Sequence, residues 1–183
     1  MRVLAILHQR DAGPGVFGRA VAARGDTLEE WQPAEQPEPP RVDHDAVMTF
    51  GGAMNADQED RHPWLTREKA LLGELAHSGV PLLGVCLGAQ LLAEAAGGAA
   101  PRASEPEIGW REVTLEAAAS GDPLLGALPD RFHSFQWHSY EAVPPSGATV
   151  LARSAVCAQA YRLEGRQAWG CLLYTSPSPR DRS

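Results

Sequence analysis

Three short runs of apolar residues in the first half of the chain constrain its fold more than any other feature. They occupy residues 3–7 (VLAIL), 45–50 (DAVMTF) and 80–85 (VPLLGV). A strand without polar alternation is typical of a parallel sheet that is covered on both faces. Segments with helical character follow the runs, at residues 16–24, from Pro63 onward and at 87–96. Strands that alternate with helices predict an α/β fold with a doubly wound, mostly parallel sheet.

The second half of the chain has a different pattern. Short segments separated by turn residues follow Pro101, at residues 111–115, 132–137, 149–152 and 157–163. Such segments predict an antiparallel extension of the same sheet. The length of 183 residues suits one domain of this kind and is too short for two independent ones.

Charge and cysteine content argue against several functional classes. The formal net charge is −7 and the 16 basic residues form no cluster, which argues against nucleic acid or an anionic membrane as a partner. The most apolar window, residues 80–100, contains Gln90 and Glu94 and is a poor membrane span. Three cysteines are too few for a disulfide framework, and their spacing suits no zinc site. Because the N-terminus also lacks a signal-peptide pattern, we expect a cytoplasmic protein without metal or cofactor.

The sequence Gly84-Val85-Cys86-Leu87-Gly88 joins the third apolar run to the helix that follows it. A nucleophile on a tight strand-to-helix turn needs small residues two positions to either side, because larger side chains would collide there. The turn also places the thiol at a helix N-terminus, where the helix dipole and free backbone amides favour the thiolate. We interpret Cys86 as a nucleophile that attacks a carbonyl carbon. A small core cysteine between packing glycines is the alternative.

A second glycine turn, Gly51-Gly52, ends the second apolar run. Ligands of open α/β sheets bind at this carboxyl edge of the strands. The backbone amides of this turn and the amide of Leu87 are the groups expected to form an oxyanion hole for a tetrahedral intermediate. Without Cys86 the same glycines would be interpreted as an ordinary tight turn.

Five segments make the chain resemble a class I glutamine amidotransferase, most closely the glutaminase domains of the GMP-synthase type. They are TFGGAMN (49–55), PWLTREKALL (63–72), VPLLGVCLGAQLLAEAAGG (80–98), EIGW (107–110) and QWHSY (136–140). The resemblance implies a flavodoxin-like sheet with helices on both faces. It also implies hydrolysis of L-glutamine through a γ-glutamyl thioester, with ammonia passed to a synthetase partner or domain.

The resemblance also assigns roles to individual positions. Cys86 matches the nucleophile of the family, and Gly51, Gly52 and the Leu87 amide match its oxyanion hole.

Substrate contacts follow in the same way. Gln90 matches a residue that contacts the substrate glutamine from the first helical turn. Ser139 and Tyr140 match a segment whose backbone holds the α-amino and carboxylate groups of the substrate. The family usually has Asp or another residue at the position of Tyr140.

A cysteine amidotransferase needs a base for the thiol proton and a carboxylate to orient that base. In this family both come from a C-terminal His-x-Glu element, typically within a Gln-Phe-His-Pro-Glu run. Here residues 167–170 (QAWG) point into that strand, but no histidine follows His138. We therefore expect the final strand and the His/Glu pair to be missing and the chain to be inactive. His138 itself matches a family residue on a loop that faces the partner, so we expect a hydrogen-bonding role rather than a catalytic one.

The last thirteen residues, 171–183 (CLLYTSPSPRDRS), do not continue the pattern of the domain. They resemble translated sequencing-adapter sequence. We expect an incomplete amidotransferase domain at residues 1–170 and a non-native, disordered tail at 171–183, so that the domain would be truncated at its C-terminus. A natural disordered tail is the alternative.

Two further functions stay open at this point. One is a γ-glutamyl hydrolase of the same fold, which releases no channelled ammonia. The other is a regulatory or binding protein that keeps the pocket but has no catalytic activity. The sequence names no ammonia acceptor, because no synthetase domain is attached.

Overall fold

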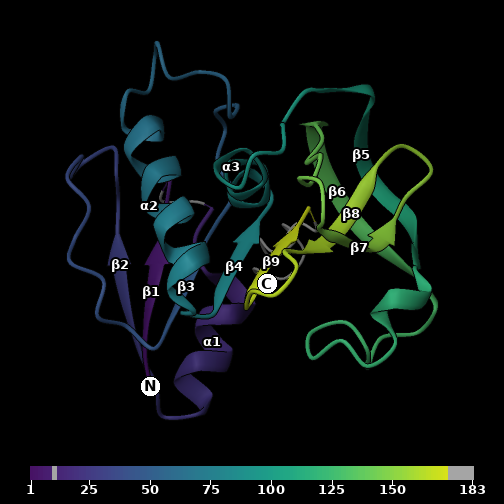
Figure 1. Cartoon of the computed structure of the whole chain (residues 1–183), viewed down its shortest axis with the longest axis horizontal. Coiled ribbons are helices and arrows are strands. Elements are labelled where there is room, and N and C mark those ends of the chain that lie inside the picture. The colour runs from purple at the N-terminus through teal and green to yellow at the C-terminus, as the bar shows by residue number, and fades with distance from the viewer. Residues whose placement is uncertain (10–11, 173–183) are drawn as a thin grey trace, which may run out of the picture.

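One mixed β-sheet runs through the whole molecule (Figure 1). The computed structural model describes residues 1–9 and 12–172. Within these residues, the strands are hydrogen-bonded in the order β2-β1-β3-β4-β9-β8-β7-β5-β6. Their bounds are β1 Arg2–Ile6, β2 Thr27–Trp31, β3 Ala46–Thr49, β4 Leu82–Val85, β5 Arg102–Leu115, β6 Arg131–Tyr140, β7 Thr149–Arg153, β8 Ala158–Arg162 and β9 Ala168–Cys171.

The two ends of the sheet differ in strand direction. Strands β2, β1, β3, β4 and β9 pair in parallel, which is the strand order of flavodoxin-like folds. From β9 onward, every pair is antiparallel. The predicted α/β class, with a parallel part and an antiparallel extension, is confirmed. The three apolar runs of the sequence become β1, β3 and β4, which are adjacent as expected.

Helices cover both faces of the parallel part. On one face, α2 (Trp64–Ser78) and α3 (Leu87–Ala95) contribute most of their buried residues to the largest apolar cluster. On the other face, Phe17 of α1 (Gly15–Ala23) packs against a cluster formed by Ala5, Leu7, Phe50 and Val85. A smaller cluster lies at the antiparallel end, beside the 3-10 helix Ala117–Ala119. This doubly wound arrangement places the carboxyl ends of β1, β3 and β4 together at one edge.

The expectation that the final strand would be missing is wrong. Residues Ala168–Cys171 form β9, which lies between β4 and β8. A side chain at Gly170 would place a Cβ 2.3 Å from the ring of Tyr161. Because glycine leaves this space, the Tyr161 ring packs against β9, and its hydroxyl donates a hydrogen bond to the Ala89 carbonyl at 2.6 Å. The strand is therefore fixed by its own residues and by α3.

The remainder of the predicted tail, residues 173–183, lies outside the described residues. Within the part of the chain that is described, no helix has the length and apolar character needed to cross a bilayer.

Candidate active site

Cys86 lies directly after β4 and immediately before α3, on a sharp turn. Its φ of 54° makes it the sole non-glycine residue with positive φ among the described residues. A Cβ at Gly84 would lie 2.5 Å from the Gly88 carbonyl oxygen, and one at Gly88 would lie 2.3 Å from the Thr49 carbonyl oxygen. The turn therefore requires glycine at both positions, which is the steric reason inferred from the sequence.

The Gly51-Gly52 turn lies beside Cys86, at the end of β3. A Cβ built on Gly51 would be 3.7 Å from the Cys86 sulfur, and one on Gly52 would be 2.8 Å from the Cβ of His8. The Gly88 N–H donates to the Phe50 carbonyl at 3.1 Å and ties the two turns together. Among the described residues, no hydrogen-bond acceptor is found for the N–H groups of Gly51 and Gly52.

The thiol of Cys86 differs electrostatically from the expectation. Burial raises its pKa to about 11, and the backbone N–H of Leu87, which lowers the pKa, offsets this only in part. Within the described residues, no imidazole bonds to the sulfur. The expected stabilisation of the thiolate by the helix N-terminus is therefore outweighed, and this thiol needs a base before it can attack.

A cavity of about 260 Å³ opens over the thiol. This volume approaches the lower end of small-molecule pockets, about 300 Å³. It is lined by Gly52, Ala53, Met54, Asn55, Cys86, Leu87, Gln90, Ile108, Trp137, His138, Ser139 and Tyr140. Every predicted site residue except Gly51 is in this lining, and a Cβ built on Gly51 would lie 3.5 Å from the Cβ of Cys86. The structure thus brings the sequence-predicted residues together in one pocket.

Gln90 and Tyr140 both line this cavity and are hydrogen-bonded to each other. The Gln90 side-chain amide donates to the Tyr140 carbonyl at 2.9 Å. The nearby His138 Nδ1 lies 3.0 Å from the same oxygen, and because a carbonyl only accepts, that nitrogen carries the proton. Two donors from two different elements therefore fix the backbone of Ser139 and Tyr140.

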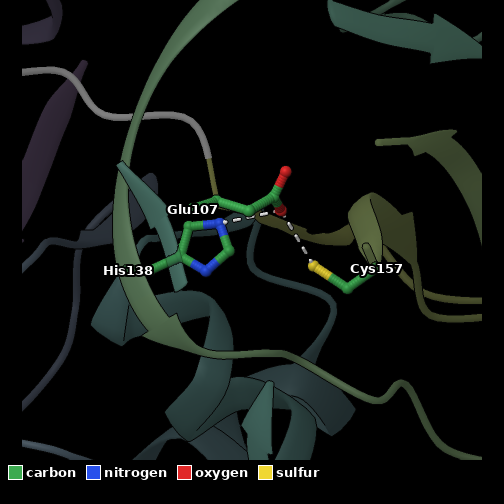
Figure 2. A group of neighbouring side chains, drawn as sticks. All are labelled: Glu107, His138 and Cys157. Atoms are coloured by element: carbon green, nitrogen blue, oxygen red, sulfur yellow. Dashed lines mark hydrogen bonds and ion pairs between the residues drawn. The ribbon is translucent and has the colours of Figure 1, made fainter. Parts of the chain in front are cut away.

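His138 lies in β6 and is buried, not on a loop as expected. Its Nε2 faces a Glu107 carboxylate oxygen at 3.4 Å, and Cys157 approaches the same oxygen (Figure 2). That oxygen also accepts hydrogen bonds from Ser154 and Gln159. Burial lowers the pKa of His138, and the opposing effect of Glu107 is weaker.

The group of Glu107, His138 and Cys157 consists of residue types that bind metals, with ligand atoms within 4.8 Å of one another. Its carboxylate oxygen, however, already accepts three hydrogen bonds from Ser154, Cys157 and Gln159. The protein's own donors therefore satisfy this buried carboxyl group, and the hydrogen bond from Gln159 links β8 to β5.

A second buried pair was missed by sequence reasoning. His8, just after β1, lies 2.8 Å from the Glu68 carboxylate of α2. Because 60 residues separate the two, no local spacing could have revealed the pair.

Comparison with known proteins identifies the family of the chain. A family model described as glutamine amidotransferase class-I matches residues 19–171. The chain belongs to this family. Two solved amidotransferase structures superpose closely on it. One, from Thermotoga maritima, has a TM-score of 0.88 and 28% identity, covering 98% of this chain and 77% of that one. The other, from Methylobacillus flagellatus, has a TM-score of 0.87 and 30% identity, and the match covers 97% of this chain and 71% of that one.

Among curated relatives of this amidotransferase, the glutamine amidotransferase-like protein YfeJ of Salmonella typhimurium is 29% identical over 163 residues. The match covers 86% of this chain and 68% of YfeJ. The A subunit of the glutamine-hydrolyzing GMP synthase of Halobacterium salinarum is 33% identical over 121 residues, covering 65% of this chain and 58% of the relative. The chain thus spans between about half and two thirds of the length of these relatives.

Proposed function

We propose that this amidotransferase hydrolyses the side-chain amide of L-glutamine through a thioester on Cys86. The observation that carries the proposal is the position of the thiol: it lies on a strained turn, beside the Gly51-Gly52 turn, in the lining of a small cavity. A nucleophile and oxyanion donors that face one reacting atom are the requirement for acyl transfer.

The steps follow from these positions. The Cys86 sulfur attacks the amide carbon of glutamine, and the amides of Gly51, Gly52 and Leu87 stabilise the negative oxygen of the tetrahedral intermediate. The C–N bond then breaks, and nitrogen leaves as ammonia after gaining a proton. Water hydrolyses the remaining thioester to give glutamate and the free thiol. Ser139 and Tyr140, held by Gln90, bind the α-amino and carboxylate groups of the substrate.

Proton transfer is the step for which the described residues supply no group. A thiol with a pKa near 11 is protonated at neutral pH, so both attack and departure of ammonia need a general acid–base residue. In the family this residue belongs to a His-x-Glu element, and residues 173–183 contain neither His nor Glu. We infer that the 183-residue chain binds glutamine and reacts at Cys86 but turns over slowly.

We further propose that the ammonia goes to a synthetase partner. The A subunits of GMP synthases are among the relatives. Two apolar residues that line the pocket, Ile108 and Trp137, are 53% and 61% exposed, and Trp110, which follows Ile108 on β5, is 65% exposed. Large exposed aromatic groups beside a reactive centre suit a protein interface.

The experiment is a comparison of products and substrates. Glutamate and ammonia are measured after incubation with L-glutamine, and amine release is measured with γ-glutamyl anilide, for the native protein and for Cys86→Ala. Cys86-dependent reaction restricted to glutamine supports the proposal. Faster reaction of the anilide indicates a γ-glutamyl hydrolase. If neither substrate reacts and Cys86 is also not labelled by a glutamine analogue, the protein has a binding role without catalysis.

A further inference from the structure

The buried His8–Glu68 pair contacts the Gly51-Gly52 turn through the Gly51 carbonyl. Both side chains are 0% exposed. Neither residue belongs to the cavity lining, so the proposed chemistry gives them no role. A buried ionisable pair needs an explanation because its desolvation is costly.

The two ring nitrogens of His8 each face a hydrogen-bond acceptor. His8 Nε2 lies 2.8 Å from a Glu68 carboxylate oxygen, and Nδ1 lies 3.3 Å from the Gly51 carbonyl oxygen. Both partners are acceptors, but a neutral imidazole has one N–H. Both contacts are therefore hydrogen bonds only when the pair carries one proton in addition to the N–H of a neutral imidazole. That proton lies either on His8, as an imidazolium, or on Glu68.

The groups around His8 favour its charged form. Burial lowers the pKa of His8, but Glu68, together with the carbonyls of Gly51 and Phe50, outweighs burial and raises the pKa above its ordinary value. The ring of Trp64 stacks on the imidazole at 5.5 Å and 14°. Among the described residues, Glu68 is the titratable side chain that raises this pKa. Burial raises the pKa of the Cys86 thiol, which lies beside Gly51, to about 11.

Glu68 ties down the same turn at a second point. Its other carboxylate oxygen accepts a hydrogen bond from the Thr49 hydroxyl at 2.8 Å. Thr49 is the last residue of β3, two positions before Gly51. One carboxylate of α2 thus controls both the end of the strand and, through His8, the carbonyl of the turn.

The orientation of that carbonyl determines where the next amide points. In a trans peptide the C=O of one residue and the N–H of the next point in opposite directions, and no peptide bond among the described residues is cis. A Gly51 carbonyl held on His8 therefore directs the Gly52 N–H away from His8. Gly52 lines the cavity over Cys86. A glycine peptide without this contact is free to flip.

We propose that His8 and Glu68 are positioning residues for the oxyanion hole: His8, held by Glu68, fixes the Gly51 carbonyl so that the Gly52 N–H faces the reacting carbonyl. The inference rests on the proposed thioester chemistry of Cys86. It predicts that the pair affects reactions that build negative charge on a carbonyl oxygen and leaves simple alkylation of the thiol unchanged.

The test uses the full chain and two reagents. A chloromethyl ketone analogue of glutamine labels cysteine through a tetrahedral adduct whose oxygen occupies the oxyanion hole. Iodoacetamide alkylates the thiol by direct displacement and needs no such hole. The maximal labelling rate and the half-saturating concentration for the ketone are measured at Cys86 by mass spectrometry, beside the iodoacetamide rate.

Two matched variants separate the roles. In His8→Gln, the new side-chain amide reaches the position of the His8 Nε2 atom and still donates to Glu68. It makes no hydrogen bond to the Gly51 carbonyl. Removal of one oxyanion donor costs about 10²–10³-fold in rate, so we expect the ketone rate to fall at least about tenfold. The half-saturating concentration and the iodoacetamide rate stay unchanged. The control is His44→Gln, because His44 is a buried histidine that contacts Glu29 at 3.0 Å away from the turn.

In Glu68→Gln, the new amide donates to Nε2 of a neutral His8 and still accepts from Thr49. This variant is expected to change the pH dependence of labelling, because the hydrogen bond of His8 to the Gly51 carbonyl no longer depends on an imidazolium. In the native protein, the ratio of the ketone rate to the iodoacetamide rate should fall as the pH rises through the raised pKa of His8. In Glu68→Gln the ratio should stay flat.

The outcomes are distinguishable. If the native protein is not labelled at Cys86 by the ketone, the proposed function fails and the inference fails with it. If the native protein is labelled but His8→Gln has the native rate, the inference alone is overturned. Should His8→Gln not fold, a native ratio that is independent of pH would overturn it equally.

Discussion

The backbone N–H of Cys86 donates a hydrogen bond to the carbonyl of Cys171 at 2.8 Å. Because β4 and β9 are parallel, with Val85 opposite Cys171, both strands end at the same edge of the sheet. Cys171, the last residue of β9, thus lies beside the proposed nucleophile.

Replacement of residues 172–183 by a segment with Gln-Phe-His-Pro-Glu should increase glutaminase turnover. General acid–base catalysis is worth about 10²–10⁴-fold, and we expect a gain of that order. Glutamate release is measured for both proteins, with a His-to-Ala version of the new segment as control. Equal and strong Cys86-dependent turnover by the unmodified protein would mean that another residue, with His138 first to be tested, is the base.

Gly88→Ala should destabilise the fold and the nucleophile turn together. Its Cβ would lie 2.3 Å from the Thr49 carbonyl oxygen, and overpacking of this kind costs about 1–3 kcal/mol. The free energy of unfolding is measured in urea. Gly73→Ala is the matched control, because its Cβ would meet its nearest neighbour at 3.4 Å; a similar loss in both variants would contradict the steric explanation.

Gln90→Leu should weaken glutamine binding about tenfold or more without unfolding the protein. The substitution removes the donor to the Tyr140 carbonyl and leaves this partly buried carbonyl with fewer partners, a change of about 1–3 kcal/mol. Affinity for L-glutamine is measured by calorimetry. Glu94→Gln, on the same helix but paired with Lys69, should bind as the native protein does. Native affinity in Gln90→Leu would remove this residue from the site.

Alkylation of Cys86 by iodoacetamide should keep rising with pH up to about 11. Burial raises the pKa of its thiol to about 11, so the thiolate fraction increases about tenfold for each pH unit below that value. The rate is followed by mass spectrometry from neutral pH upward, with a small thiol as reference. A plateau near neutral pH would show that a group outside the described residues activates the sulfur.

The sequence reveals those parts of the site that depend on local spacing. The apolar runs predict β1, β3 and β4, and Gly84 and Gly88 predict the sharp turn at Cys86. Strand β2 (TLEEW) escapes detection because it is an edge strand with mostly exposed positions. The sequence fails to predict strand β9 because Tyr161, which packs over Gly170, belongs to a different strand.

Other features depend on contacts that no spacing encodes. His8 and Glu68 are 60 positions apart in the sequence, and Glu107 and Cys157 are 50 positions apart. Burial raises the pKa of Cys86, whereas the position at a helix N-terminus alone predicts a lowered pKa. These contacts become visible only when the strand ends are brought to one edge.

The central claim is that Cys86 is the nucleophile of a glutamine pocket, and site-specific labelling tests it most directly. The native protein is treated with the chloromethyl ketone analogue of glutamine, with and without excess L-glutamine, and both Cys86 and Cys157 are mapped by mass spectrometry. We predict that Cys86 is labelled first, that glutamine protects it, and that Cys157, whose pKa burial raises to about 12, stays unmodified. Labelling of Cys157 before Cys86, or labelling of Cys86 that glutamine does not slow, would contradict the claim.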